Sequence, residues 1–285
     1  MIHTTSNIRL ESPAGRPFLL DFYHDPQQPQ APLLLFAHGF KGFKDWGHWE
    51  RLAQHFVAAG FAFAKFNFSH NGTTPEEPEH FGDLEAFGQN NYSKELSDLD
   101  RVLQWVAEDL PGLAPMVDTS KIALIGHSRG GGIGIIKAAE EERIGALITW
   151  AAVSRLDYMW QQRPELLDGW KADGVLHILN GRTKQQMPLY YQLVEDFETH
   201  RQRLDARQAM QQLNKPCLII HGDEDPAVPL AAAQELKALN PAAQLHIIKG
   251  ANHVFGGSHP YTDASLPPHS AELAEQSIQF LTSIW

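Results

Sequence analysis

The residues best suited to chemistry are a serine, an aspartate and a histidine, each of which closely follows a short apolar run. Ser128 lies in the pentapeptide GHSRG, which follows the run Ile122–Ile125 and precedes a Gly/Ala-rich segment of helical character. A serine on such a tight strand-to-helix turn projects its hydroxyl above the sheet, and glycines at positions 126 and 130 remove the Cβ atoms that would collide with neighbouring elements. The pattern predicts that Ser128 is a nucleophile.

The pentapeptide alone has a simpler interpretation, because serine is a common helix N-cap and G-x-S-x-G also occurs by chance. Two later motifs favour the catalytic interpretation. Asp225 follows the run Cys217–Ile220 within HGDEDP, and His253 follows Gln244–Ile248 within GANHVF. An acid and then a histidine, each just beyond a later strand, is the order that a serine nucleophile on this type of turn requires.

Each of the three residues has a distinct expected role. A serine hydroxyl is a weak nucleophile near neutral pH, so His253 must take its proton, and a carboxylate must hold the imidazole in the correct tautomer. We expect Asp225 to be that carboxylate, with Asp223 as the alternative that more naturally accepts hydrogen bonds from turn amides. Taken singly, Asp225 would be an ordinary Asp-Pro turn and His253 a loop histidine. Only their joint placement indicates catalysis.

A fourth motif, FAHGF, closes the first central strand and predicts an oxyanion hole. Gly39 allows the backbone to approach a substrate, and the backbone N–H groups of Phe40 and Arg129 would supply the two donors that acyl transfer needs. The alternative is a plain strand-to-loop turn. We expect the side chain of His38 to be structural in either case.

The elements that must position these residues are short apolar runs alternating with amphipathic segments. The runs are Leu33–Ala37, Phe61–Phe68, Ile122–Ile125, Ala146–Ala152, Cys217–Ile220 and Gln244–Ile248. Continuous apolar runs are typical of strands buried on both faces. An opening hairpin is expected around the turn Pro13–Arg16. We predict an α/β fold with a mostly parallel central sheet of about eight strands and helices on both faces.

The alternation stops after residue 154 and resumes near residue 215. Between them, aromatic and Gln-rich helical sequence surrounds one candidate hairpin, Val175–Leu179 and Gln186–Leu189, across Asn180-Gly181. The sequence predicts a core of residues 1–153 and 215–285 that carries an inserted cap, residues 154–214.

Composition narrows the class of protein further. The formal charge of −11 on 285 residues argues against a nucleic-acid partner. The amino-terminal residues do not resemble a secretory signal and no apolar run is long enough to span a membrane, so we expect a cytoplasmic protein without a membrane partner. The single Cys217 and the scattered histidines lead us to expect no disulfide, metal or cofactor. The oligomeric state is left open, and a homodimer is compatible with the sequence.

The segments HGF, GHSRG, HGDEDPAVP and GANHVF together resemble the α/β-hydrolase superfamily from about residue 33 to the end of the chain. The chain is most similar to bacterial carboxylesterases of the dienelactone-hydrolase-like and cinnamoyl (feruloyl) esterase-like groups, and more loosely to serine peptidases of the prolyl-oligopeptidase type. The resemblance implies an α/β-hydrolase fold. It also implies Ser128 as nucleophile, Asp225 as acid, His253 as base, and the backbone N–H groups of Phe40 and Arg129 as oxyanion donors. Branches with an aspartate nucleophile or an HGGG loop fit less well, because this chain has a serine and HGF.

We therefore expect a carboxylesterase that acts on small-molecule esters through an acyl-serine intermediate. The alternatives are a peptidase or aminopeptidase, or an acyl-CoA thioesterase, with the same triad, and a ligand-binding receptor on the same fold. The candidate wall residues of the substrate pocket are Phe43, Trp46, His70, Trp160 and Met187. His70 is favoured to order its loop, and aromatic residues of a cap often form its own small core. The substrate stays open at this level.

Overall fold

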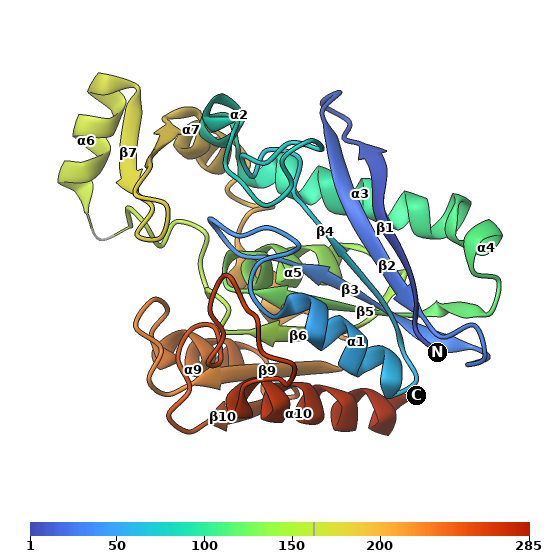
Figure 1. Ribbon diagram of the computed structural model, residues 1–285. Helices are drawn as coiled ribbons and strands as arrows, with labels where there is room; N and C mark the ends of the chain where they lie inside the picture. Colours follow the sequence, from blue (N-terminus) through green and yellow to red (C-terminus); the bar gives the residue numbers. More distant parts are fainter. Residues whose placement is uncertain (162) are drawn as a thin grey trace.

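The computed structural model describes residues 1–161 and 163–285, and a mixed eight-stranded sheet forms its centre (Figure 1). In spatial order the strands are β1 (His3–Glu11), β2 (Pro17–His24), β4 (Ala62–Phe66), β3 (Ala31–Ala37), β5 (Val117–His127), β6 (Ile144–Trp150), β9 (Cys217–Gly222) and β10 (Gln244–Ile248). The pairs β1–β2 and β2–β4 are antiparallel, and all other pairs are parallel. The prediction of a mostly parallel sheet of about eight strands is confirmed.

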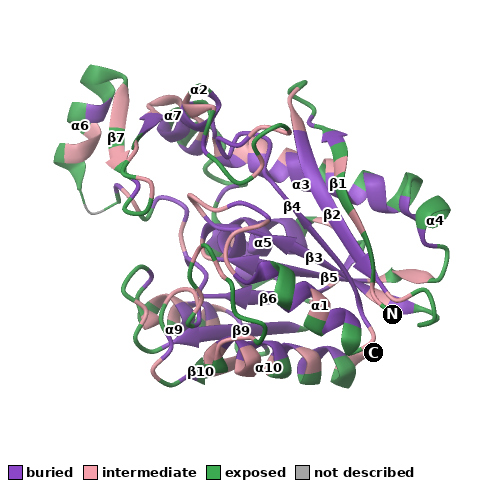
Figure 2. Cartoon of the chain, viewed as in Figure 1, coloured by how far each residue is buried: buried purple, intermediate pink, exposed green. Residues whose placement is uncertain are grey.

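The central strands are apolar throughout because both of their faces are covered. Leu33 and Leu35 of β3 pack into the hydrophobic core on one side of the sheet, whereas Leu34 and Phe36 pack into the core on the other side. Figure 2 shows this burial as unbroken along the middle strands, while the outward faces of the helices are exposed. The alternation of side chains along a strand thus explains why the sequence here lacks an alternating polar pattern.

Two helical layers cover the sheet. The helices α1 (Trp49–Ala58) and α10 (Pro268–Ile284) place their apolar stripes on one face, where Phe56 and Leu273 belong to the same core. The other face is covered by α3 (Tyr92–Glu108), α5 (Arg129–Glu140) and α9 (Leu230–Leu239). Two short helices, α2 (Leu84–Gly88) and α4 (Leu110–Leu113), flank α3. The predicted helices on both faces are confirmed, although the two short ones have too little periodicity to be expected.

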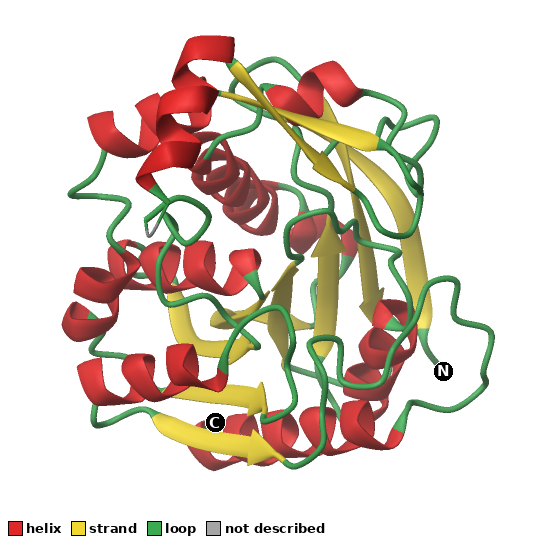
Figure 3. Ribbon diagram, turned by 90° about the vertical axis from the view of Figure 1, so that its left-hand side faces the viewer, coloured by secondary structure: helices red, strands yellow, loops and turns green. Residues whose placement is uncertain are grey.

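The segment between β6 and β9 contains α6 (Pro164–Asp173), β7 (Val175–Leu179), β8 (Gln186–Tyr190), α7 (Gln192–Thr199) and α8 (Ala206–Gln212). Strands β7 and β8 form a separate antiparallel sheet, whose two strands cross the top of the view in Figure 3. Helix α8 packs instead against α5 and α9 of the core. That residues 154–214 act as one cap remains a prediction.

The largest difference in boundaries concerns β5, which begins at Val117, before the run that predicts it. Val117 and Asp118 pair with Ala31 and Pro32, and three extra residues then bulge out before Ile122 pairs with Leu33. The polar residues of this bulge hide the early pairing from the sequence pattern. No helix of residues 1–161 and 163–285 has the length and apolar character needed to cross a membrane.

Candidate active site

The candidate site lies where the strand order of the sheet reverses. Strand β3 is flanked by β4 on one side and β5 on the other. The helix that follows β3, α1, covers one face of the sheet, and the helix that follows β5, α5, covers the other. Such a switch point opens a crevice at the carboxyl ends of the strands, and ligands of open α/β sheets bind there. The loop after β3 and the turn after β5 carry the FAHGF and GHSRG motifs to this crevice.

Ser128 occupies a strained turn between β5 and α5. Its φ of 56° and ψ of −119° are unusual for a residue with a side chain, and such strain costs about 1–3 kcal/mol. The turn is held by hydrogen bonds from the Ser128 N–H to the Trp150 carbonyl (2.9 Å) and from the Val153 N–H to the Ser128 carbonyl (3.2 Å). A Cβ atom at Gly126 would overlap the carbonyl of Gly130, so glycine is required there.

The structure joins the three predicted residues in one hydrogen-bonded chain. The Ser128 Oγ lies 3.0 Å from His253 Nε2, and His253 Nδ1 lies 2.7 Å from Asp225 Oδ2. The Asp225 side chain is 0% exposed and the His253 side chain 20% exposed. This is the arrangement in which a histidine can take the serine proton while a buried carboxylate stabilises the resulting imidazolium.

Asp225 is fixed by its own turn. Its Oδ1 accepts hydrogen bonds from the backbone N–H groups of Ala227 (2.8 Å) and Val228 (2.9 Å), so Oδ2 is left to face His253. Burial alone would raise the pKa of Asp225, but hydrogen bonds from His221 and His253 lower that pKa well below its usual range. The carboxylate is therefore ionised and keeps the proton of neutral His253 on Nδ1, which leaves Nε2 free to accept from the serine.

Asp223, the alternative acid, has a different place. Its Oδ1 accepts a hydrogen bond from the Gly250 N–H at 2.6 Å and thereby ties the β9 turn to the loop after β10. The structure thus brings Asp225, and not Asp223, to His253.

Two further histidines support the site, and both lie within the quoted motifs at positions to which the sequence analysis gives no role. His127 Nε2 lies 2.9 Å from the His253 carbonyl, and because a carbonyl can only accept, His127 donates its proton there. Burial lowers the pKa of His127 to about 3, so this ring is neutral. His221 Nε2 lies 2.9 Å from the Val228 carbonyl and 3.4 Å from Asp225 Oδ2. Both depend on tertiary contacts that the sequence pattern does not reveal.

The loop after β3 lies directly against the serine. A Cβ atom at Gly39 would be only 2.8 Å from the Ser128 Cβ. His38 fixes this loop, since its Nε2 accepts from the Phe68 N–H (3.2 Å) and its Nδ1 therefore donates to the Gly39 carbonyl (2.8 Å). Burial lowers the pKa of His38 to about 4, which keeps the ring neutral. These contacts give His38 the structural position that the sequence leads us to expect.

The two expected oxyanion donors lie at this loop and at the start of α5. Phe40 lines the cavity beside Ser128, and Arg129 is the first residue of α5, where backbone N–H groups have no partner within the helix. Their side chains pack on each other, with the Arg129 guanidinium 3.8 Å from the centre of the Phe40 ring. Glu95 Oε1 lies 3.5 Å from the same guanidinium. A buried cation thus links the loop after β3 to α5.

A cavity of about 210 Å³ opens in front of Ser128 and His253. Of the five candidate wall residues, only Trp46 lines it. Asn180 and Arg182, which the sequence reasoning missed, reach the cavity from the turn between β7 and β8. The signal that could have found them is the turn itself, because a hairpin inserted above the sheet presents its tip to the crevice.

The other four candidates lie elsewhere, which corrects the expectation that they line the pocket. Phe43 and Met187 are fully buried in the hydrophobic core, and Trp160 packs against other aromatic rings of its segment. His70 Nδ1 lies 2.8 Å from the Ser69 Oγ and orders the loop after β4. One physical reason explains Phe43, Met187 and Trp160. Burial stabilises an apolar side chain in a core as well as in a pocket wall, so the residue type does not distinguish the two.

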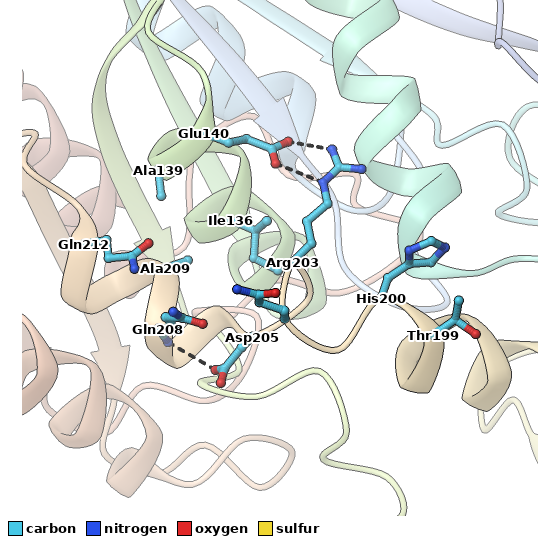
Figure 4. Close-up of a pocket in the computed structure, with 11 residues that line it drawn as sticks. Ile136, Ala139, Glu140, Thr199, His200, Arg203, Asp205, Gln208, Ala209 and Gln212 are labelled. Carbon is cyan, nitrogen blue, oxygen red and sulfur yellow. Dashed lines mark hydrogen bonds and ion pairs between the residues drawn. The ribbon is translucent and has the colours of Figure 1, made fainter.

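A larger hollow of about 570 Å³ lies between α5 and the segment around α7 and α8 (Figure 4). Arg203 crosses it to Glu140, with its Nε and Nη2 3.0 and 2.8 Å from the two carboxylate oxygens. This hollow contains neither Ser128 nor His253. Arg203 and Glu140 pair with each other, and Asp205 accepts hydrogen bonds from the backbone N–H groups of Arg207 and Gln208. The smaller cavity, which contains Ser128 and His253, is therefore the candidate active site.

Sheet topology, switch point and the position of the serine turn together define a hydrolase of the α/β type. The alpha/beta hydrolase family matches the chain over residues 34–263, and the chain belongs to that family. The described residues contain no group of three or more His, Cys, Asp or Glu side chains arranged to hold a metal ion.

Known proteins agree with this assignment. The chain is 27% identical to the biotin biosynthesis bifunctional protein BioHC of Teredinibacter turnerae, over 92% of this chain and 49% of that protein. The chain spans about half the length of the curated relatives it matches. Among solved structures, it is similar to Est1E from Butyrivibrio proteoclasticus with ferulic acid bound (TM-score 0.70, 20% identity, 97% and 98% of the two chains). It is also similar to a dienelactone hydrolase from Anabaena variabilis (TM-score 0.63, 17% identity, 98% of both).

Proposed function

We propose that this hydrolase is a carboxylesterase that cleaves carboxylic esters through an acyl-serine intermediate at Ser128. The observation that carries the proposal is the unbroken hydrogen-bonded chain from Ser128 Oγ through His253 to a buried, ionised Asp225. The similar Est1E structure holds ferulic acid, and a bound carboxylic acid supports the proposal that the products here include a carboxylic acid. Three side chains and two backbone amides suffice for this chemistry, so the proposal invokes no metal or cofactor.

The first half of the reaction forms the acyl-enzyme. Ser128 Oγ attacks the ester carbonyl carbon while its proton passes to His253 Nε2, and Asp225 stabilises the imidazolium. The carbonyl oxygen becomes an oxyanion that accepts hydrogen bonds from the backbone N–H groups of Phe40 and Arg129. When the tetrahedral intermediate collapses, the bond to the alcohol oxygen breaks and His253 returns the proton to the leaving alcohol.

The second half releases the acid. A water molecule attacks the acyl carbonyl and gives its proton to His253 Nε2, and the same two amides stabilise the oxyanion. Collapse then breaks the bond to Ser128 Oγ, which recovers its proton from His253. The cycle consumes one water and yields one alcohol and one carboxylic acid, so atoms and protons balance.

The residues that line the cavity favour an ester substrate over a peptide with a free amino terminus. An aminopeptidase needs carboxylates near the reacting bond to bind a free ammonium group. The acids of α7, Glu195, Asp196 and Glu198, do not line the cavity. A ligand-binding receptor on the same fold is disfavoured for a different reason, since it has no need of all three members of the triad.

Replacement of Ser128 tests the proposal. Ser128→Ala is expected to abolish hydrolysis of p-nitrophenyl butyrate and labelling by a fluorophosphonate probe, while the thermal midpoint of unfolding stays nearly unchanged. The matched control is Ser120→Ala, which removes an exposed hydroxyl near the other end of β5 and is expected to retain activity and labelling. Full activity in Ser128→Ala would overturn the acyl-serine mechanism.

A further inference from the structure

Two cations line the serine cavity without any carboxylate beside them. Lys41, in the loop after β3, and Arg182, in the turn after β7, line the same cavity as Ser128 and His253. None of the described residues that line this cavity is an aspartate or a glutamate. The cavity walls are therefore positive in a chain whose formal net charge is −11.

The surroundings do not neutralise these two charges. Burial lowers the pKa of Lys41, and the nearby charge of Arg129 lowers it further. Arg182 is an exposed residue whose partial burial also lowers its pKa, with no carboxylate to oppose the shift. A neighbouring anion would raise both values. Arg129 shows the contrast, because its guanidinium lies 3.5 Å from Glu95.

Aromatic rings and the hairpin turn position the two cations. The Arg182 guanidinium lies 5.6 Å from the centre of the Phe43 ring, and the backbone N–H of Arg182 donates to Asn180 Oδ1 at 3.1 Å. Lys41 Nζ lies 5.8 Å from the centre of the Phe40 ring. Contact with a ring face attracts a cation but leaves its N–H donors available. The Lys41 ammonium and the Arg182 guanidinium are thus held near the cavity, and no carboxylate accepts their hydrogen bonds.

We propose that the preferred ester carries a carboxylate a few carbon atoms from the scissile carbonyl, and that Arg182 and Lys41 bind this carboxylate. The inference rests on the proposed function and narrows its substrate class. A guanidinium matches a carboxylate with two parallel hydrogen bonds, and an ammonium adds a point charge. The cavity of about 210 Å³ suits a compact acid ester better than a substrate attached to a nucleotide-sized carrier.

Two esters of one acid test the inference. Methyl hydrogen adipate ends in a carboxylate where dimethyl adipate has a second, uncharged methyl ester. Initial rates of hydrolysis are followed by proton release at neutral pH and are given per ester group. We expect the wild-type protein to prefer the charged half-ester in kcat/KM. Arg182→Gln and Lys41→Gln are each expected to lower the ratio of the two kcat/KM values about fivefold, which equals about 1 kcal/mol at 1.4 kcal/mol per factor of ten.

Lys184→Gln is the matched control, because Lys184 lies in the same turn and is exposed like Arg182, but does not line the cavity. It removes the same charge and should leave the ratio unchanged. Added salt should also reduce the wild-type preference by screening the charges. Equal effects of Arg182→Gln and Lys184→Gln would overturn the inference, because they would reflect the net charge of the protein alone.

Failure of the inference and failure of the proposed function give different results. If the wild-type protein cleaves dimethyl adipate at least as well as the half-ester, only the carboxylate site is refuted. If it cleaves no oxygen ester at all, the proposed function is refuted as well. A second pair consists of hexanoyl-CoA, whose carrier has negatively charged phosphates, and the uncharged hexanoyl thioester of N-acetylcysteamine. An Arg182-dependent preference confined to this pair would refute the carboxylate and assign the cations to phosphate.

Discussion

Replacement of Asp225 by asparagine isolates one charge in the candidate triad. The Asp225 Oδ1 accepts hydrogen bonds from the Ala227 and Val228 N–H groups at 2.8 and 2.9 Å. Asparagine keeps these bonds only if its carbonyl oxygen takes the Oδ1 position. Its amide group then faces His253 Nδ1, where the charged Oδ2 lies at 2.7 Å in the native protein. The turn is preserved while the partner of the imidazole changes from acceptor to donor.

The consequence is a wrong tautomer with a large effect on rate. An amide donor opposite Nδ1 favours the proton on Nε2, so His253 can no longer accept the proton of Ser128. Loss of the carboxylate also leaves the imidazolium without its counter-charge. We expect kcat/KM for p-nitrophenyl butyrate to fall about 10⁴-fold, equivalent to about 5 kcal/mol at 1.36 kcal/mol per factor of ten.

Asp223→Asn is the matched control, because it makes the same chemical change two residues away. Asp223 Oδ1 accepts from the Gly250 N–H at 2.6 Å, and an asparagine oxygen can still accept there. We expect its kcat/KM to stay within about threefold of wild type and its unfolding free energy to fall by at most about 1 kcal/mol. The reasoning is refuted if Asp225→Asn keeps more than a tenth of the activity, or if both variants lose activity equally.

Two further predictions concern the loop beside the serine and a buried acid. Gly39→Ala places a Cβ atom 2.8 Å from that of Ser128, so the loop must shift. We expect kcat/KM to fall on the order of 10²-fold while circular dichroism shows that the protein remains folded. Near-native activity would contradict this prediction. Burial raises the pKa of Asp98 from its ordinary value of 3.8 to about 7. In the unfolded chain this carboxyl loses its proton near pH 4, so the wild-type folded state loses stability relative to Asp98→Asn as the pH rises from about 4 to about 7. Urea unfolding at pH 4 and pH 8 measures the difference between the two proteins, and a difference that does not change with pH would exclude an elevated pKa.

The sequence predicts the sheet and the order of the triad because both depend on local patterns. Strand β10 coincides with its apolar run, and β9 starts where its run starts, since buried parallel strands need continuous apolar residues. The turn at Ser128 also has a local origin, in glycines that must lack Cβ atoms. The expectation that Asp223 accepts from the amides of its turn is wrong, because the amides of Ala227 and Val228 donate to Asp225, whereas Asp223 accepts from Gly250 in another loop.

The walls of the cavity were decided by tertiary structure alone. Phe43 and Met187 are apolar whether they face a pocket or a core, and only the packing shows that they are in the core. Arg182 joins the cavity because a hairpin far along the chain brings its turn to the loop after β3. Ser128 is therefore specified largely by its neighbours in sequence, whereas the residues that would select its substrate come together only through long-range contacts.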